Sequence, residues 1–265
     1  IMSRFPKKIV ERYEFLFSPF FDSVNIILVF FISYFLTGDL FVSIIAQVIY
    51  ILTPIIILEN SSATPRSLGY TLFTLVFLFL FLNQENSNNF FVLLAIFFGS
   101  LIFLSHRFTT QGFLFFSIFF SVVNKNPIYF LVFISSFVLA LFFSKGFYLE
   151  VLKGHIGNLK FWYRNIQYRF YHQVKGDYES HNTKDFIFRL YNQFLKFPPF
   201  VLTITNPWTL AVFYFFLFKT FTNPILHNFA LLVIFSYTLS ILTIWIPKFR
   251  FLGEGQRYLE LSAFP

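Results

Sequence analysis

Long runs of apolar residues alternate with short polar stretches along the whole chain. Eight such runs stand out, at residues 20–37, 40–58, 68–82, 90–104, 108–123, 127–143, 200–218 and 225–246. Each run is continuously apolar, whereas the strands of a membrane β-barrel alternate apolar and polar residues over only about ten positions. A helix satisfies all of its backbone hydrogen bonds within one segment, as lipid requires. The pattern therefore predicts an all-α fold, a polytopic transmembrane helix bundle of about eight spans.

The third, fourth and fifth runs are short for membrane spans. A helix exposed to lipid needs roughly 20 residues to cross about 30 Å of hydrocarbon, and these runs are shorter. Neighbouring helices are expected to shield them, unless they tilt and thin the bilayer locally. The segment 68–123 is therefore predicted to form three helices packed inside the bundle.

The amino-acid composition agrees with a membrane setting. Hydrophobic residues make up 57% of the chain and charged residues 12%, against roughly 45–50% and 25% in an average soluble domain. Phe alone supplies 47 of the 265 residues. Because lipid-facing positions need apolar bulk rather than one particular residue, no Phe stripe is interpreted as a ligand site. The sequence contains no Cys, which excludes disulfides and Cys-based metal sites within it.

The distribution of Lys and Arg predicts the orientation. If each run crosses the membrane once, eighteen of the twenty cations fall on one side, nine of them in the 144–199 loop. Only Lys125 and Lys219 fall on the other side. The positive-inside rule places the cation-rich side, and with it the 144–199 loop, in the cytoplasm. The net charge of +8 is thus a sign of topology before it is a sign of nucleic-acid binding.

The 144–199 loop is predicted to be an interfacial element of a single transmembrane domain covering 1–265. One helical face collects apolar side chains, and the cations lie on the other faces; the apolar residues are Leu159, Trp162, Tyr163, Ile166 and Phe170. A second such helix is expected after Thr183. We expect membrane lipid as the partner, with a cradle for a lipid-borne phosphate as the alternative.

No metal site and no nucleic-acid partner is predicted for this loop. His155, His172 and His181 are too far apart in sequence for a compact metal-binding pattern. Aromatic residues interleaved with Arg also suit single-stranded RNA, but no RNA-binding fold fits the loop. The sequence identifies no cofactor.

Ionisable groups at the membrane edge are the main candidates for function, because charge in hydrocarbon is costly. Two polar turns on the cytoplasmic side could bind the phosphate of a substrate or a lipid. In the first, Glu59 and Arg66 are the candidates, and a turn that satisfies its own polar groups is the alternative. In the second, His106, Arg107 and Gln111 either bind a phosphate or hold the turn at the headgroups.

Acidic residues at two further places are candidates for function. Asp39 follows Gly38 on the opposite side of the membrane and opens the second run, so it is either a catalytic acid or the N-cap of the next helix. Near the end of the chain, Glu254, Arg257 and Glu260 recur every three residues. That spacing is typical of an ion pair on a helix surface, with the arginine reaching toward the headgroups.

Four polar stretches carry a resemblance to a known group of proteins. ENSSATPRSLG (59–69), LSHRFTTQG (104–112), LKGHIGNLKFWYRN (152–165) and FLGEGQRYLE (251–260) resemble uncharacterised bacterial membrane proteins similar to GT-C glycosyltransferases. The resemblance implies a bacterial inner-membrane location, a polyprenyl-phosphate sugar as partner and a role in envelope polysaccharide assembly. It also implies a main catalytic acid in a first outer loop. We expect the sequence to be an excerpt that starts after that loop, with Asp39 at the place of a second acid.

Two other functions stay open. A transporter or lipid flippase usually shows internal repeats and broken spans, whereas here Pro207 interrupts the interior of a run and no repeat is evident. A non-catalytic subunit of a larger membrane complex is the third possibility. The sequence contains no Ser-His-Asp set, phosphate loop or close pair of carboxylates that would decide between them.

Overall fold

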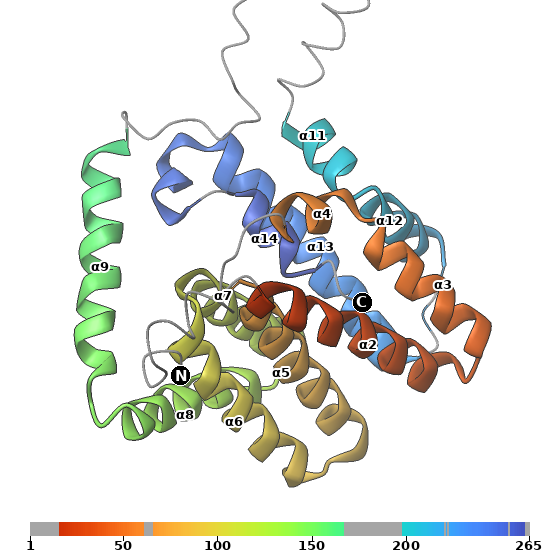
Figure 1. Cartoon of the computed structure of the whole chain (residues 1–265), viewed down its shortest axis with the longest axis horizontal. Helices are drawn as coiled ribbons and strands as arrows, with labels where there is room; N and C mark the ends of the chain where they lie inside the picture. The colour runs from red at the N-terminus through yellow and green to blue at the C-terminus, as the bar shows by residue number, and fades with distance from the viewer. Residues whose placement is uncertain are drawn as a thin grey trace, which may run out of the picture. The chain divides into compact units, whose positions relative to one another are not determined.

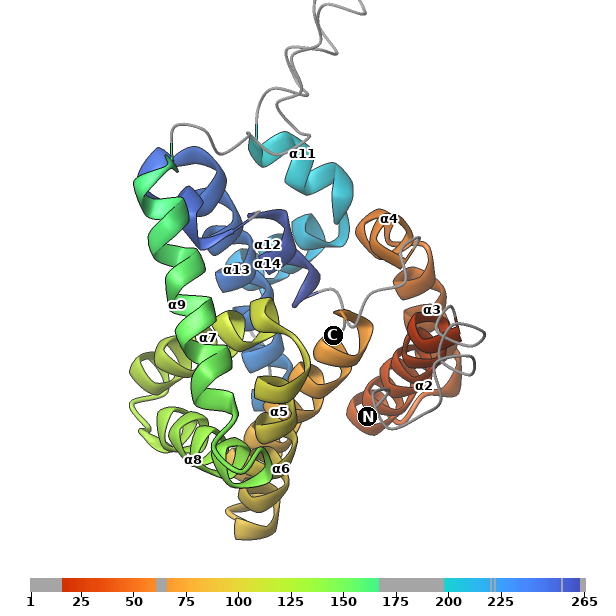
Figure 2. The same cartoon turned by 60° about the vertical axis from the view of Figure 1, so that its left-hand side comes forward.

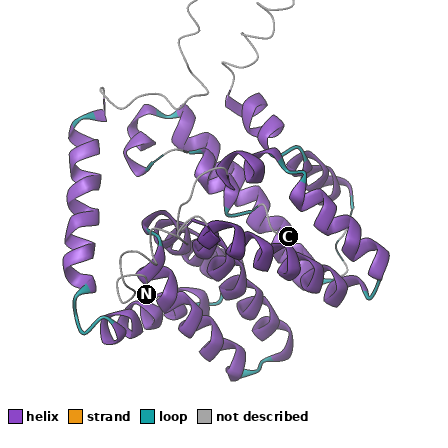
Figure 3. Ribbon diagram, viewed as in Figure 1, coloured by secondary structure: helices purple, strands orange, loops and turns teal. Residues whose placement is uncertain are grey.

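The computed structural model describes residues 16–60, 66–166, 198–219, 221, 223–253 and 255–262. Every regular element among these residues is a helix (Figure 3), comprising twelve α-helices and one 3₁₀ helix. The predicted all-α fold is therefore confirmed. The described residues up to Tyr148 form one compact unit, and those from Leu149 onward form another.

The described residues of the first unit form seven helices (Figure 1). They are α2 (Phe17–Thr37), α3 (Leu40–Ile51), α4 (Pro54–Asn60), α5 (Arg66–Asn86), α6 (Asn89–Ser105), α7 (Arg107–Val123) and α8 (Ile128–Phe143). Local sequence explains several helix ends. Helix α2 ends at Gly38, whose positive φ of 67° suits glycine, and its N–H donates to Tyr34 O at 2.8 Å. Asn88 caps α6 by accepting a hydrogen bond from Phe90 N.

Helix α5 lies at the centre of the first unit. Twelve of its 21 residues are buried, and it packs against α2, α6 and α7. Its buried phenylalanines meet those of α7; for example, the rings of Phe73 and Phe116 are 5.2 Å apart and edge-on, and those of Phe81 and Phe120 are 5.1 Å apart. Such pairs contribute about 0.5–1.5 kcal/mol each beyond their buried area. Aromatic packing thus accounts for the Phe-rich sequence of α5 and α7.

The second unit is organised around one long helix. Its elements are α9 (Tyr148–Arg164), α11 (Pro198–Thr205), α12 (Trp208–Phe218), α13 (Pro224–Trp245), η5 (Pro247–Leu252) and α14 (Gln256–Glu260). Helices α11, α12 and α14 and the 3₁₀ helix η5 all pack on α13 (Figure 2). The last turn of α9 meets η5 through the rings of Tyr163 and Phe251, which are 5.4 Å apart.

Among the described residues, three helices are long and apolar enough to cross a membrane: α2 from Pro19 onward, α5 and α13. A fourth candidate is the pair α11 and α12, if these two helices form one span with a bend of 106° between them. The crossing number of about eight stays a prediction, because α3, α6, α7 and α8 are shorter apolar helices.

The helices depart from the apolar runs at three places. The run 40–58 is interrupted at Thr53, where α3 stops and α4 begins at a proline, and the run 200–218 is interrupted at Asn206 and Pro207. Conversely, α5 extends beyond the run 68–82 because its ends are polar but still helical. Its 21 residues, about 32 Å of helix, are enough for one span. The expectation that this third run is too short was therefore wrong.

Candidate functional site

A hydrogen-bonded polar cluster joins α2, α3 and α5 within the first unit. Asn25 of α2 is 0% exposed, and its Oδ1 accepts a hydrogen bond of 2.6 Å from the Thr71 hydroxyl. Its amide also donates to Ser67 O at 3.5 Å, and the hydroxyl of Tyr50 is a further hydrogen-bond partner. An amide in an apolar helix is costly unless it is satisfied in this way. These bonds therefore hold three helices in one arrangement.

Asp22 brings a carboxyl group to the same cluster. It precedes Asn25 by three residues, so the two side chains share one face of α2. The carboxyl is half-buried and accepts a hydrogen bond from the Ser67 hydroxyl. The Tyr50 side chain is an electrostatic neighbour of this carboxyl. We call Asp22, Asn25, Tyr50, Ser67 and Thr71 the Asp22 cluster.

The sequence interpretation did not single out Asp22. Two signals were available. It is the only Asp, Glu, Lys or Arg in the run 20–37, and an ionisable residue inside an apolar helix is by default a candidate for function. In addition, Asp22 and Asn25 are three residues apart, and Ser67 and Thr71 are four residues apart, which is helical spacing. What the sequence could not show is that these two pairs face each other.

The helices that follow the two predicted cytoplasmic turns, α5 and α7, contact each other at their first turns. Gly69 of α5 lies so close to α7 that an added Cβ would stand 2.5 Å from Thr109 Oγ1 and 3.2 Å from His106 Cβ. His106 Nδ1 lies 3.1 Å from Thr109 Oγ1. The first turn of α5, which begins at Arg66, therefore packs on the first turn of α7, which begins at Arg107. Ser67 and Gly69 differ by about 200° around α5, so the Asp22 cluster and the contact with α7 lie on different faces of the first turn of α5.

The remaining predicted residues are placed differently. By helical spacing Gln111 shares a face of α7 with Arg107, opposite the face of Thr109, so it does not join His106 at the contact with Gly69. The side chain of Glu59 lies outside the described part of the chain, and its pairing with Arg66 stays a prediction.

Asp39 is the N-cap of α3. It is exposed, and its Oδ1 accepts hydrogen bonds from Phe41 N at 2.7 Å and Val42 N at 3.2 Å. The N-cap alternative is therefore what the structure shows. Asp39 follows Asp22 by 17 residues of mostly helical chain, which amounts to about 25 Å at 1.5 Å per residue. The two carboxyl groups belong to opposite ends of α2 and cannot act on the same atom.

A second polar contact joins α13 to α14 within the second unit. An added Cβ at Gly255 would stand 2.5 Å from Thr243 Oγ1 and 2.8 Å from the backbone oxygen of Ser240. The Ser236 hydroxyl donates a hydrogen bond to Tyr258 O. We call this close approach the Gly255 junction. Small residues let two backbones come together in this way.

The position of Glu260 contradicts the prediction that it lies on a helix surface. It is 0% exposed, so it does not form part of an ion pair on a helix surface, and Glu254 lies outside the described residues. The reason is that α14 packs against α13 instead of facing the surroundings. Among the described residues, no group of three or more His, Cys, Asp or Glu gathers as a metal site would require.

No family model matches the chain, and no curated protein or solved structure matches it either. These comparisons identify no family for the chain. The part of the chain that the structure describes is all-helical, with three or four candidate membrane spans.

Proposed function

We propose that the chain is the helical body of a polytopic integral membrane protein of the bacterial inner membrane that acts as a GT-C-like glycosyltransferase on lipid-phosphate-linked sugars. The observation that carries the proposal is the contact of Gly69 with His106 and Thr109. This contact joins residues from two of the four polar stretches on which the resemblance depends, 59–69 and 104–112. It also places two helix N-termini, each beginning with an arginine, at one end of the first unit.

This arrangement suits the phosphate of a lipid carrier. Helix N-termini present backbone N–H groups and a partial positive charge to an anion. An arginine adds a planar fork that can hold two phosphate oxygens at once. Arg66 and Arg107 are each partly exposed, so both side chains can reach a headgroup. His106, at the junction between α6 and α7, adds a further donor.

The sugar transfer itself would need a carboxylate elsewhere. In an inverting transfer, an acceptor hydroxyl attacks C1 of the sugar, the bond from C1 to the carrier phosphate breaks, and a base takes the hydroxyl proton. By the predicted topology Asp39 lies on the outer side and the arginines on the cytoplasmic side. The proposed role of Arg66 and Arg107 is therefore to bind a carrier phosphate, separately from the catalytic step.

Binding of a polyprenyl phosphate tests this role directly. The full-length protein would be purified in detergent, and its affinity for undecaprenyl phosphate compared with that for undecaprenol, which lacks the phosphate. Arg107→Gln is expected to weaken phosphate binding about tenfold to a hundredfold, since a hydrogen bond to a charged group contributes about 1.5–3 kcal/mol. Arg107→Lys should also weaken it, because the fork is lost.

Lys125→Gln is the matched control, because Lys125 is an exposed cation just beyond the other end of α7. It should bind undecaprenyl phosphate like the unaltered protein. Equal affinity for undecaprenyl phosphate and undecaprenol, or no effect of either Arg107 variant, would leave Arg107 a residue that fixes topology. Sugar transfer to an acceptor in membranes holding equal amounts of each variant would then test the enzymatic part of the proposal.

The bent pair α11 and α12 favours a transporter or lipid flippase as the second candidate. The two helices meet at 106°, and Asn206, at the break, is only 4% exposed. Discontinuous helices of this kind commonly line the binding sites of transporters. In vesicles holding the full-length protein and an NBD-labelled polyprenyl phosphate, a flippase would expose the inner-leaflet label to dithionite. Sugar transfer without such exposure would favour the glycosyltransferase.

A further inference from the structure

Helix α9 carries a narrow apolar stripe that is exposed. Leu149, Ile156 and Tyr163 are 46%, 43% and 64% exposed, and their spacing of seven residues aligns them along one side of the helix. The apolar residues next to this stripe, such as Leu152 and Leu159, are half-buried. The stripe is therefore the outer edge of a wider apolar face.

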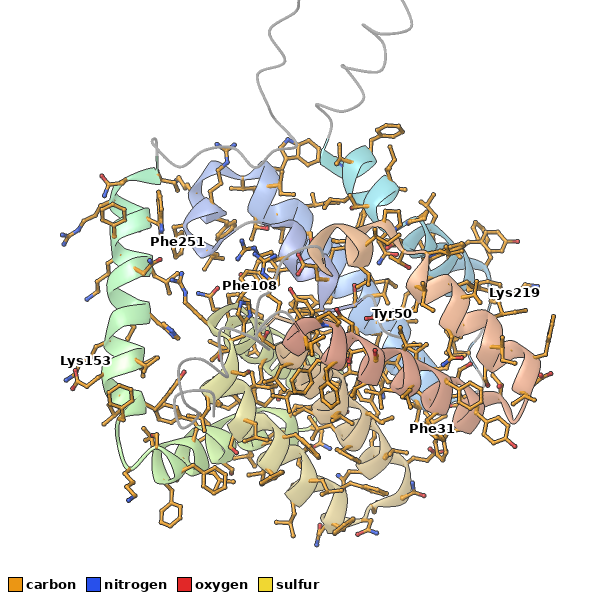
Figure 4. All side chains as sticks on the ribbon, viewed as in Figure 1. Phe31, Tyr50, Phe108, Lys153, Lys219 and Phe251 are labelled. Carbon is orange, nitrogen blue, oxygen red and sulfur yellow. The ribbon has the colours of Figure 1, made fainter. Side chains whose placement is uncertain are left out.

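Cations run parallel to this stripe. Lys153 follows Leu149 by four residues, and Lys160 follows Ile156 by four, so each lysine lies beside one apolar residue of the stripe. Both lysines are exposed, and Lys153 projects outward from α9 (Figure 4). Lys153 forms an exposed ion pair of 2.7 Å with Glu150, so Lys160 is the freer cation of the two.

The side of α9 beyond the lysines is open around its two glycines. It includes Gly154 and Gly157, and a Cβ added at either would meet no heavy atom within 4 Å. The stripe and the two lysines lie within one part of the helix circumference, whereas Phe161, which is 56% exposed, lies on the side of the glycines. A helix that is apolar on one side, with lysines at the edge of that side, is typical of the boundary between lipid headgroups and acyl chains.

The start of α9 is fixed by packing. Tyr148 is 1% exposed, and its ring contacts those of Phe103 and Phe137 at 5.5 and 6.0 Å. Burial raises the pKa of the Tyr148 hydroxyl to about 12, so this anchor is neutral at physiological pH. The turn before it is closed by hydrogen bonds, among them Gly146 N to Leu141 O at 2.8 Å. Tyr148, the last described residue of the first unit, is therefore held by packing within that unit.

We propose that α9 lies on an anionic phospholipid surface, with Leu149 and Ile156 entering the acyl boundary and Lys153 and Lys160 contacting lipid phosphates, while the Tyr163 ring packs on Phe251 at the end of this stripe. The charge of the lysines complements anionic lipid, and their flexible stems can follow the apolar stripe into the interface. A protein groove that binds a helix takes apolar anchors at positions i, i+3 or i+4, and i+7, and here the exposed set lacks the middle anchor. The proposal rests on membrane insertion of the chain but is independent of sugar transfer.

Single cysteines test the proposal, because the chain has none of its own. Ile156→Cys and Gly157→Cys would each be labelled with NBD in the full-length protein. These neighbours differ by about 100° around the helix, so Gly157 is the matched control. Nanodiscs would contain either phosphatidylcholine alone or equal parts of phosphatidylcholine and phosphatidylglycerol. The label at 156 is expected to shift to the blue and to be quenched by doxyl lipids in the anionic discs, while the label at 157 stays in water.

The lysines provide the second arm. Lys160→Gln should lower the lipid-bound fraction of α9 in anionic discs, reducing its insertion constant about fivefold, since one lysine near such a surface contributes about 1 kcal/mol. The same loss should follow from 1 M salt, which shortens the Debye length to about 3 Å. Protection of position 156 that is the same in both kinds of disc and in detergent would overturn the proposal in favour of a protein contact. Exposure of position 156 to water in anionic discs would also overturn it.

Discussion

The Asp22 cluster and the Gly255 junction both bring polar groups together between helices, but by different means. In the Asp22 cluster, side chains of α2 and α5 reach across and hydrogen-bond, with Asn25 at the centre. In the Gly255 junction, α14 approaches α13 because one side chain is missing. A hydrogen-bonded contact can adjust when one partner changes, since other polar groups are near. A contact that depends on an absent side chain cannot adjust in this way, because an added side chain would force backbone atoms to move.

Gly255→Ala should therefore be the most damaging of four changes that test this difference. The new Cβ would stand 2.8 Å from the backbone oxygen of Ser240, which cannot turn aside as a side chain would. Overpacking of this kind costs about 1–3 kcal/mol. Thermal unfolding in detergent, followed by circular dichroism, should show the loss. An unchanged unfolding temperature would mean that α14 is not held tightly against α13.

Asn25→Leu should cost less, about 1–2 kcal/mol, which is at the upper end of what hydrogen bonds between membrane helices contribute. The loss is limited because the Thr71 hydroxyl keeps a second acceptor, Ser67 O at 2.8 Å. The loss of stability is measured by unfolding of the purified chain. Combining Asn25→Leu with Thr71→Val should cost clearly less than the sum of the two single changes.

Asp22→Asn serves as the control for this pair, because it keeps an oxygen that can accept from Ser67. It should be milder than Asn25→Leu. A strictly additive double variant at Asn25 and Thr71 would show that the two residues do not act together.

Asp39→Ala should cost about 1 kcal/mol, the usual effect of removing an exposed N-cap. Both hydrogen bonds of Asp39 go to the next turn of its own helix, so no contact between helices is lost. Asp39→Ser should recover most of the stability, because serine also caps helices well. If the full-length protein transfers sugar, the serine variant separates the two roles of this residue. Retained transfer indicates a cap alone, and lost transfer with retained stability indicates a catalytic acid.

Gly157→Ala should have the smallest effect and the opposite sign. This glycine lies inside α9 with nothing near its missing Cβ, so alanine should stabilise the helix by up to about 1 kcal/mol. The same substitution at Gly255 and at Gly157 thus separates a steric requirement from simple helix propensity. Equal destabilisation at both sites would contradict the steric explanation of the Gly255 junction.

Much of the secondary structure could be predicted from the sequence because helix ends depend on neighbouring residues. Gly38 and Asp39 end one helix and begin the next as expected. The breaks at Thr53 and Asn206 were missed, although a proline follows each, because a continuous apolar run was read as one helix. The polar ends of α5 were missed for the converse reason, since helix formation does not require apolar residues.

The candidate site was predicted only in part. The stretches that contain Arg66 and His106 were recognised as polar turns, but their contact through Gly69 depends on how α5 and α7 cross. Asp22 was overlooked because its partner, Ser67, lies 45 residues further along the chain.

The sequence by itself determined that the chain is helical, where most of its helices lie and that many of them are strongly apolar. Only the tertiary structure decided which faces of those helices meet. The physical reason is that an apolar helix in lipid can present the same residues to lipid and to its neighbours, so the periodicity that reveals the buried face of a soluble helix is weak. Small and polar residues then select the contacts, and residues such as Gly69, Asn25 and Gly255 show this role only when their neighbours are known.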